Sequence, residues 1–233
     1  MKKRKRSADG FSLVELLVGT ILFTIVTGIA FSLLMSAQLR YQGESTVTEA
    51  FQQANVALDQ IVRDVHSAGY PPANSFATGV ALNNPNLAAL PFSWSPGYTN
   101  TPPTPCTVGV GGTCGAVPGD YDLIVETDLG NGVQWIRYSL VGTTLMRAMV
   151  PKAQFQDPVG STTGSLVPYL DNVMNGSLPI FSYAYDSGAT HWPSNIREVN
   201  ISLMVRSLQP DPQTKQYRTI TLTGQAVRFN PNQ

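Results

Sequence analysis

A long uninterrupted hydrophobic run is the first pattern in the sequence. Between residues 11 and 39 the only charged side chain is Glu15, and the 24 residues from 16 to 39 carry no charge. An α-helix rises about 1.5 Å per residue, and about 20 helical residues cross the hydrocarbon layer of a bilayer. The run therefore predicts a membrane-spanning helix. A cleavable secretory signal fits less well, because its apolar part usually has about 7–15 residues.

A one-sided hydrophobic pattern follows between residues 47 and 68. Apolar residues recur there at alternating spacings of four and three, which indicates an amphipathic helix with one packed face. This stripe consists of Val47, Phe51, Ala54, Leu58, Ile61, Val65 and Ala68. The polar positions between them are expected to face water: Glu49, Gln52, Gln53, Asp59, Gln60, Arg63 and Asp64. No proline occurs from residue 11 to 70, so both segments can form one helix of roughly 55 residues, with Gly43 as the expected bend.

The pattern becomes irregular after the helix. Gly69 can adopt the left-handed conformation that ends helices, and two prolines follow at 71 and 72. Residues 65–119 contain no Asp, Glu, Lys or Arg and hold nine of the 17 prolines, which predicts a long loop. Three aromatic residues are expected to anchor this loop on the head, with exposed contacts as the alternative: Phe92, Trp94 and Tyr98.

Short antiparallel strands are predicted from residue 121 onward, because apolar and polar residues alternate there and glycines separate the runs. The expected strands cover residues 122–127, 133–141, 144–150, 180–185, 197–207 and 217–229. The last strand is expected to pair with its predecessor across Pro210-Asp211-Pro212. One face of the sheet should pack on the helical stripe. The fold class is therefore α+β, with a long N-terminal helix packed on an antiparallel β-sheet head.

The charges are few and unevenly placed. The chain of 233 residues has 15 Lys and Arg against 15 Asp and Glu, and only 13% of its residues are charged. This neutrality argues against a nucleic-acid-binding domain. Five of the positive charges lie in the first six residues, directly before the hydrophobic run. Such a cluster stays in the cytoplasm, which places the residues after about 39 on the far side of the membrane.

Glu15 is the anomaly of this segment, because an ionised carboxylate is unfavourable in a spanning helix. On charge alone, Glu15 can be an interfacial carboxylate that reaches back to the headgroups. Its context is Asp9-Gly10-Phe11-Ser12-Leu13-Val14-Glu15-Leu16-Leu17. That string resembles the N-terminal motif of type IV prepilins and type II secretion pseudopilins in residue types, spacing and position together.

The resemblance implies specific processing. In that family a prepilin peptidase cuts after the glycine and methylates the new terminal amine. Carried over to this sequence, the cut falls between Gly10 and Phe11, and Phe11 becomes N-methylated. Glu15 then pairs with the terminal ammonium of a neighbouring subunit, so filament assembly relieves the unfavourable burial of its charge. Removal of residues 1–10 leaves 10 Lys and Arg against 14 Asp and Glu, a mildly acidic mature chain.

Later strings are similar, more specifically, to PilW-like minor pilins and J-type pseudopilins. They lie at residues 63–70, 136–140, 145–147, 181–188 and 227–230. The expected organisation is a cleaved leader (1–10), a transmembrane and filament-core helix (11–39), an amphipathic helix (40–69), a Pro/Gly-rich loop (70–120) and a β-sheet head (121–233).

The resemblance implies a non-enzymatic function: a minor pilin, a low-copy structural or priming subunit of a type IV pilus. The alternatives are a type II secretion pseudopilin and a static membrane-anchored extracytoplasmic binding domain. The implied partners are the prepilin peptidase, other major and minor pilins and the inner-membrane assembly platform, with no small-molecule substrate and no nucleic acid. The implied location is the bacterial inner membrane, with a cytoplasmic N-terminus and a periplasmic head, and then the pilus or pseudopilus at the cell surface.

The remaining candidate chemistry is sparse. Cys106 and Cys114 flank a glycine-rich turn and are expected to form a disulfide if the head lies in an oxidising compartment. The two histidines, His66 and His191, have no nucleophile or ligand at a diagnostic spacing, so no catalytic, cofactor or metal site is predicted. The densest acidic group is expected to face solvent, with a calcium site there or near Asp186 as the lesser alternative: Asp120, Asp122, Glu126 and Asp128.

Overall fold

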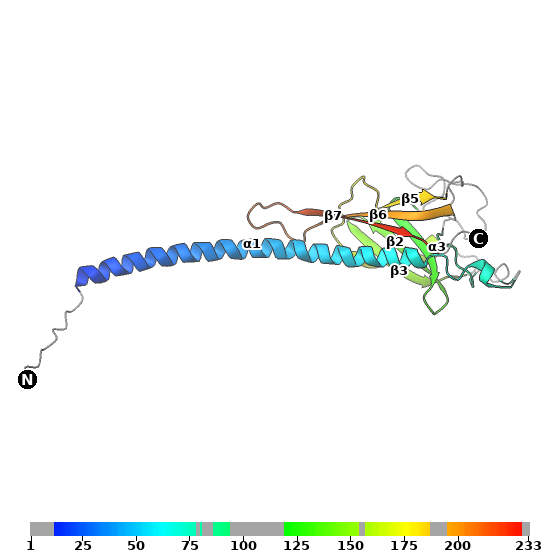
Figure 1. The fold of residues 1–233 in the computed structure, drawn as a ribbon, viewed down its shortest axis with the longest axis horizontal. Coiled ribbons are helices and arrows are strands. Elements are labelled where there is room, and N and C mark those ends of the chain that lie inside the picture. Colours follow the sequence, from blue (N-terminus) through cyan, green and yellow to red (C-terminus); the bar gives the residue numbers. More distant parts are fainter. Residues whose placement is uncertain are drawn as a thin grey trace, which may run out of the picture.

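The chain forms one long helix with a β-rich head around its second half (Figure 1). The computed structural model describes residues 12–77, 80, 86–93, 119–153, 157–186 and 195–229. Several residues singled out in the sequence lie outside these ranges: Gly10, Phe11, Trp94, Tyr98, Cys106, Cys114 and His191. The α+β class expected from the sequence is confirmed, and the arrangement is consistent with a pilin fold.

Helix α1 (Leu13–Ser67) joins the hydrophobic run and the amphipathic stripe in one element of 55 residues, as predicted. It follows Ser12, whose backbone is extended, and ends where Gly69 takes a positive φ of 80°. The helix runs unbroken through Gly43. A Cβ atom at that position would lie 3.4 Å from Asp211 Oδ2 and from Pro212 Cδ, so this glycine allows the head to approach the helix closely.

Two antiparallel sheets make up the head. The first contains, in spatial order, β1 (Asp122–Asp128), β2 (Val133–Val141), β3 (Thr144–Pro151) and β4 (Val167–Leu170). The second contains β5 (Phe181–Tyr185), β6 (Ile196–Arg206) and β7 (Thr219–Val227). Strand β7 pairs with β6 from Glu198↔Val227 to Arg206↔Thr219, which confirms the predicted pairing of the last two strands.

Three short elements were not expected from the sequence. They are a single 3-10 turn, η1 (Ala73–Ser75), a two-turn helix, α3 (Pro158–Thr163), and strand β4. Helix α3 begins at Asp157, whose carboxylate accepts hydrogen bonds from the N–H groups of Val159 and Gly160, and a proline occupies its first turn. Its six residues are too few to produce a recognisable helical periodicity.

The main hydrophobic core lies between α1 and the sheets. Most of the predicted stripe is buried there, and small side chains on the same helix face let the strands come close. The helix contributes Ala50, Ala54, Ala57, Leu58, Ile61 and Val65, and the following residue Ala68 joins them. The prediction was wrong at two positions: Phe51 is 45% exposed, whereas Asp64, expected to face water, is only 2% exposed.

The described part of the long loop is held against the edge of β1. Phe92 is fully buried and bridges to Val125, which confirms the predicted anchor at this residue. The Ser93 N–H donates to the carbonyl of Ile124 over 3.0 Å, and the Gly69 N–H donates to the carbonyl of Glu126 over 2.8 Å. The outer edge of β1 is therefore paired by segments of the same chain.

Candidate functional site

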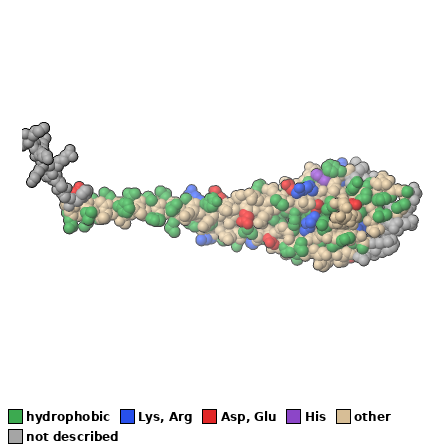
Figure 2. Space-filling view, turned by 90° about the horizontal axis from the view of Figure 1, so that it is seen from below, with side chains coloured by type: hydrophobic (Ala, Val, Ile, Leu, Met, Phe, Trp, Pro, Cys, Tyr) green, Lys and Arg blue, Asp and Glu red, His purple; other side chains and the backbone are tan. Residues whose placement is uncertain are grey.

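The apolar first part of α1 is the candidate site, because it is the largest exposed hydrophobic surface of the described residues. Its large side chains from Leu13 to Leu39 are between 40% and 80% exposed. Figure 2 shows hydrophobic side chains along the visible face of the thin stalk that extends from the head. Such a surface is stable in lipid or against other apolar helices, and it is unfavourable in water.

Glu15 lies in the first turn of this helix. Its side chain is exposed, and within the described ranges it makes no hydrogen bond or ion pair with another residue. The N-terminus of a helix stabilises a negative charge, because its backbone N–H groups have no partners within the helix. The fold thus places one carboxylate at the start of an otherwise uncharged surface.

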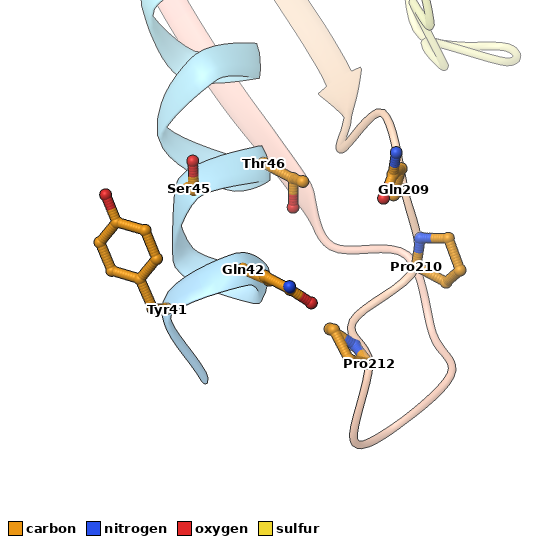
Figure 3. A pocket seen from close by; sticks show the side chains of 7 residues that line it. All are labelled: Tyr41, Gln42, Ser45, Thr46, Gln209, Pro210 and Pro212. Carbon is orange, nitrogen blue, oxygen red and sulfur yellow. The ribbon is translucent and has the colours of Figure 1, made fainter. Parts of the chain in front are cut away.

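The head leaves this apolar part free. Its contact with α1 begins near residue 41, where an open groove of about 370 Å³ lies between the helix and the β6–β7 loop (Figure 3). The groove is lined by Tyr41, Gln42, Ser45, Thr46, Gln209, Pro210 and Pro212. Roughly 40 Å of helix precedes it, which exceeds the thickness of a hydrocarbon layer. In the part of the chain that the structure describes, α1 is the one helix long and apolar enough to cross a membrane.

The other predicted site residues are not brought together by the described structure. The junction between Gly10 and Phe11 lies just before the first described residue. Cys106 and Cys114 fall in the undescribed stretch 94–118. The cleavage, methylation and disulfide therefore stay predictions.

A buried ion pair in the head corrects the expectation for the acidic group at residues 120–128. Glu126 is fully buried, and its Oε2 lies 2.6 Å from the Nζ of Lys152, which is also inaccessible. The carboxylate accepts further hydrogen bonds from Ser93 Oγ, from Trp135 Nε1 at 2.9 Å and from the Leu90 N–H at 2.9 Å. Burial lowers the pKa of Lys152, and the Glu126 carboxylate opposes this change. The pair ties the loop at 86–93 to the first sheet.

A second buried carboxylate joins the helix to the first sheet. Asp64 Oδ2 accepts a hydrogen bond of 2.5 Å from the Tyr138 hydroxyl and lies 3.1 Å from the Arg147 guanidinium. Its Oδ1 accepts a hydrogen bond from Gln60. Burial, and then the neighbouring Asp64 charge, raise the pKa of Tyr138 well above its usual value of 10.0. Asp64 therefore has a structural role at the interface between helix and sheet.

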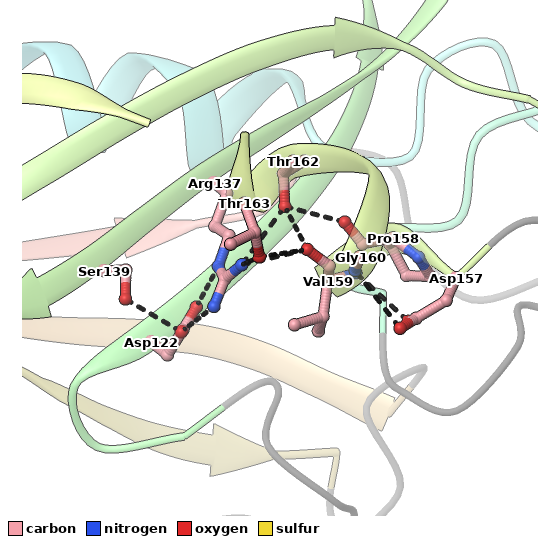
Figure 4. Close-up of polar contacts among 9 residues, drawn as sticks. All are labelled: Asp122, Arg137, Ser139, Asp157, Pro158, Val159, Gly160, Thr162 and Thr163. Atoms are coloured by element: carbon pink, nitrogen blue, oxygen red, sulfur yellow. Dashed lines mark hydrogen bonds and ion pairs between the residues drawn. The ribbon is translucent and has the colours of Figure 1, made fainter. Parts of the chain in front are cut away.

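A third polar cluster holds α3 on the first sheet (Figure 4). The Arg137 guanidinium makes two hydrogen bonds to the Asp122 carboxylate, at 2.9 and 2.5 Å. Its Nη1 also donates to the hydroxyls of Thr162 and Thr163, and Ser139 Oγ donates to the same carboxylate. Sequence reasoning missed all three clusters, because each pairs residues that are distant in the chain.

These clusters point to structural roles for the charged residues of the head. Asp128 accepts hydrogen bonds from the N–H groups of Gly130 and Gly132 in the β1–β2 turn. Asp186, the other candidate calcium ligand, lies 3.2 Å from the Arg228 guanidinium. Among the described residues, no group of three or more His, Cys, Asp or Glu side chains could hold a metal ion. His66 packs its ring on Phe229, with centroids 4.6 Å apart.

Comparison with known proteins matches one family model, the prokaryotic N-terminal methylation motif, over residues 5–31. No curated protein and no solved structure matches the chain. The match covers the last two residues of the basic cluster, the Gly10–Phe11 junction, Glu15 and the apolar start of α1. Proteins with this motif are structural subunits that are processed by prepilin peptidase and assemble with other pilins. The chain therefore carries the N-terminal methylation motif of type IV pilin-like proteins at the start of a membrane-length helix.

Proposed function

We propose that this protein is a minor pilin, a low-copy, non-enzymatic subunit that primes or caps a type IV pilus. The observation that carries the proposal is the position of Glu15, a carboxylate without a described partner in the first turn of an exposed, membrane-length helix. After cleavage between Gly10 and Phe11 it is the fifth residue of the mature chain. The N-methylated ammonium of Phe11 in a neighbouring subunit is its natural partner.

The physical basis of assembly is the relief of an unpaired charge. In the inner membrane the carboxylate lies at the start of the spanning helix, where an ionised group is unfavourable. In a filament, the apolar helices bundle, and each carboxylate can meet a terminal ammonium from an adjacent helix. An ion pair in such a low-dielectric bundle is favourable only if both partners are present. The pair therefore selects correctly processed subunits.

The head supports a minor rather than a major subunit. The sequence has a long segment without charged side chains at residues 70–119, which a densely repeated shaft subunit does not require. In the proposed orientation the N-terminus is cytoplasmic and the head periplasmic, where Cys106 and Cys114 can form a disulfide. The partners are the prepilin peptidase, other pilins and the inner-membrane assembly platform. A type II secretion pseudopilin is the alternative, because the same motif and helix would serve it equally well.

The mature N-terminus is the first test. Mass spectrometry of the protein from membranes should find a chain that starts at Phe11 with one added methyl group. The mutant Gly10→Val should keep the leader, because a branched side chain hinders backbone entry into a protease cleft. An intact leader on the wild-type protein would contradict the proposal and favour a static membrane anchor.

Glu15→Ala is the second test. The substitution should leave membrane insertion and N-terminal processing intact, but it should lower incorporation into sheared filaments by more than tenfold, because the ammonium partner stays unpaired. Thr20→Ala, another polar-to-alanine change on the same exposed helix, is the matched control and should assemble normally. Immunoblots of the filament and membrane fractions measure both. Wild-type amounts of the Glu15 variant in filaments would refute the role of the carboxylate.

A further inference from the structure

Among the described strands, none pairs with the outer edge of β7. The hydrogen bonds of β6 establish which way the backbone groups point. The Ser202 N–H donates to the carbonyl of Ile180 on the β5 side, whereas the Ser207 N–H donates to Arg218 and the Arg197 carbonyl accepts from Arg228 on the β7 side. The even-numbered residues of β6 therefore pair with β5, and its odd-numbered residues pair with β7. Because Ile201 pairs with Gly224, the even-numbered residues of β7 make the backbone hydrogen bonds to β6.

The odd-numbered residues of β7 consequently direct their N–H and C=O groups away from the sheet. These residues are Thr219, Thr221, Thr223, Gln225 and Val227, and all five are exposed. Within the described ranges, none of their backbone groups makes a further hydrogen bond. Beyond the strand, the outward N–H of Phe229 donates to the carbonyl of His66 over 3.3 Å. The strand thus presents a row of unpaired backbone groups that ends at the helix.

This edge lacks the usual protection against pairing. Native edge strands are commonly short, charged, bulged or interrupted by proline. Strand β7 has nine residues in continuous register with β6, without a charged residue or proline. The two edges of the first sheet differ from it: the chain itself covers β1, and β4 has only four residues, including Pro168. A strand edge without these features is a site where another strand can add by backbone hydrogen bonds.

An exposed aromatic side chain adjoins the same edge. Strand β7 and α1 run in the same direction, because Gly224 faces Leu58 and Phe229 reaches His66. Phe51 precedes Leu58 by about two turns, so it lies on the same face of the helix near the start of β7. It is 45% exposed although the stripe predicts burial. A chain that adds to β7 would cover this ring.

We propose that β7 accepts an extended, uncharged segment of a different protein as an additional strand, with Phe51 as an apolar contact at one end. A second copy of this chain fits less well, because edges of identical strands usually pair antiparallel about a twofold axis. Since β7 runs along α1, that pairing would point the two stalks in opposite directions. Two stalks anchored in the same membrane cannot point in opposite directions. This step rests on the proposed function. Side chains opposite the threonines are expected to be polar and uncharged or β-branched.

Photocrosslinking of the full-length protein in its own membrane tests the strand addition. The crosslinker p-benzoylphenylalanine is placed at Thr221 and, in a second variant, at Gln225. Each should crosslink to the same partner protein, at sites about four residues apart in one extended segment, because paired strands advance together. Val141, which is 57% exposed at the end of β2, is the control position and should not give this product.

Substitutions at Thr223 provide the matched pair. Thr223→Pro removes an outward N–H that the β6 ladder does not use, and it should lower the crosslink yield from Thr221 about tenfold or more. Thr223→Val keeps the N–H and should stay within about twofold of wild type. Crosslinks that map within the same chain, to a second copy, or to sites without the common spacing would overturn the proposal. The spacing between the two crosslink sites is measured in variants that keep Thr223. It therefore tests the strand addition even if the proline variant unfolds β7.

The mature N-terminus, measured on the same samples, separates the two proposals. A chain that starts at N-methyl-Phe11 but gives no spaced crosslinks refutes the strand addition and leaves the pilin assignment standing. A chain that keeps its leader but gives the crosslinks refutes the pilin assignment alone.

Discussion

Lys152→Met is expected to lower the free energy of unfolding by about 3–5 kcal/mol, the largest effect of any substitution considered for the head. The variant leaves the Glu126 carboxylate fully buried without its cation. The remaining donors, Ser93, Trp135 and the Leu90 N–H, are neutral and compensate the charge only in part. Chemical denaturation of the detergent-solubilised protein, followed by tryptophan fluorescence, measures the change.

The double variant Lys152→Met/Glu126→Gln distinguishes the charge from the packing. A neutral amide can still accept from Trp135 and Ser93, so the double variant should be more stable than Lys152→Met alone. Lys215→Met serves as the control for loss of a surface lysine, because Lys215 is exposed, and it should change stability by less than about 0.5 kcal/mol. A double variant as unstable as the single one would show that buried charge is not the cause.

Asp64→Ala should destabilise the head by about 3 kcal/mol, because it removes the acceptor shared by helix and sheet. The Tyr138 hydroxyl and the Arg147 guanidinium lose their partner in a buried site. Asp59→Ala, an exposed position on the same helix, is the matched control and should stay within about 0.5 kcal/mol of wild type. The same denaturation experiment measures both variants.

A double-mutant cycle with Tyr138→Phe tests the direct interaction. Because Tyr138 donates to Asp64 Oδ2 over 2.5 Å, the two substitutions should be non-additive, with a coupling of about 1–2 kcal/mol. Additive effects would mean that Asp64 stabilises the head through Arg147 or Gln60 instead.

Both predictions concern the attachment of other segments to the first sheet. The Asp64 cluster fixes α1 on the first sheet, and the Glu126 pair fixes the loop at 86–93 on the edge of the same sheet. Buried ion pairs suit such an interface because they define one alignment of helix and sheet, although an apolar replacement can be equally stable.

Local signals in the sequence were sufficient for the main elements. The helical period of the stripe, the absence of proline up to residue 70 and the glycine at its end determine α1. Alternation and turn glycines likewise located six of the strands within a few residues of their observed bounds. The motif around Gly10, Phe11 and Glu15 could be identified for the same reason, because it is a contiguous segment of the sequence and does not depend on a folded surface.

Tertiary structure decided what depends on partners distant in the chain. Arg147 is 83 residues from Asp64, and Lys152 is 26 residues from Glu126, so no local pattern distinguishes these buried carboxylates from solvated ones. The open edge of β7 is likewise a property of strand order, since the same nine residues in the centre of a sheet would have no free backbone groups. The sequence by itself thus determined the helix, most strands and the processing motif, whose physics is local. Only the fold decided which charged side chains are buried and which described strand edge stays unpaired. Burial and strand pairing depend on residues that are distant in the sequence and adjacent in the fold.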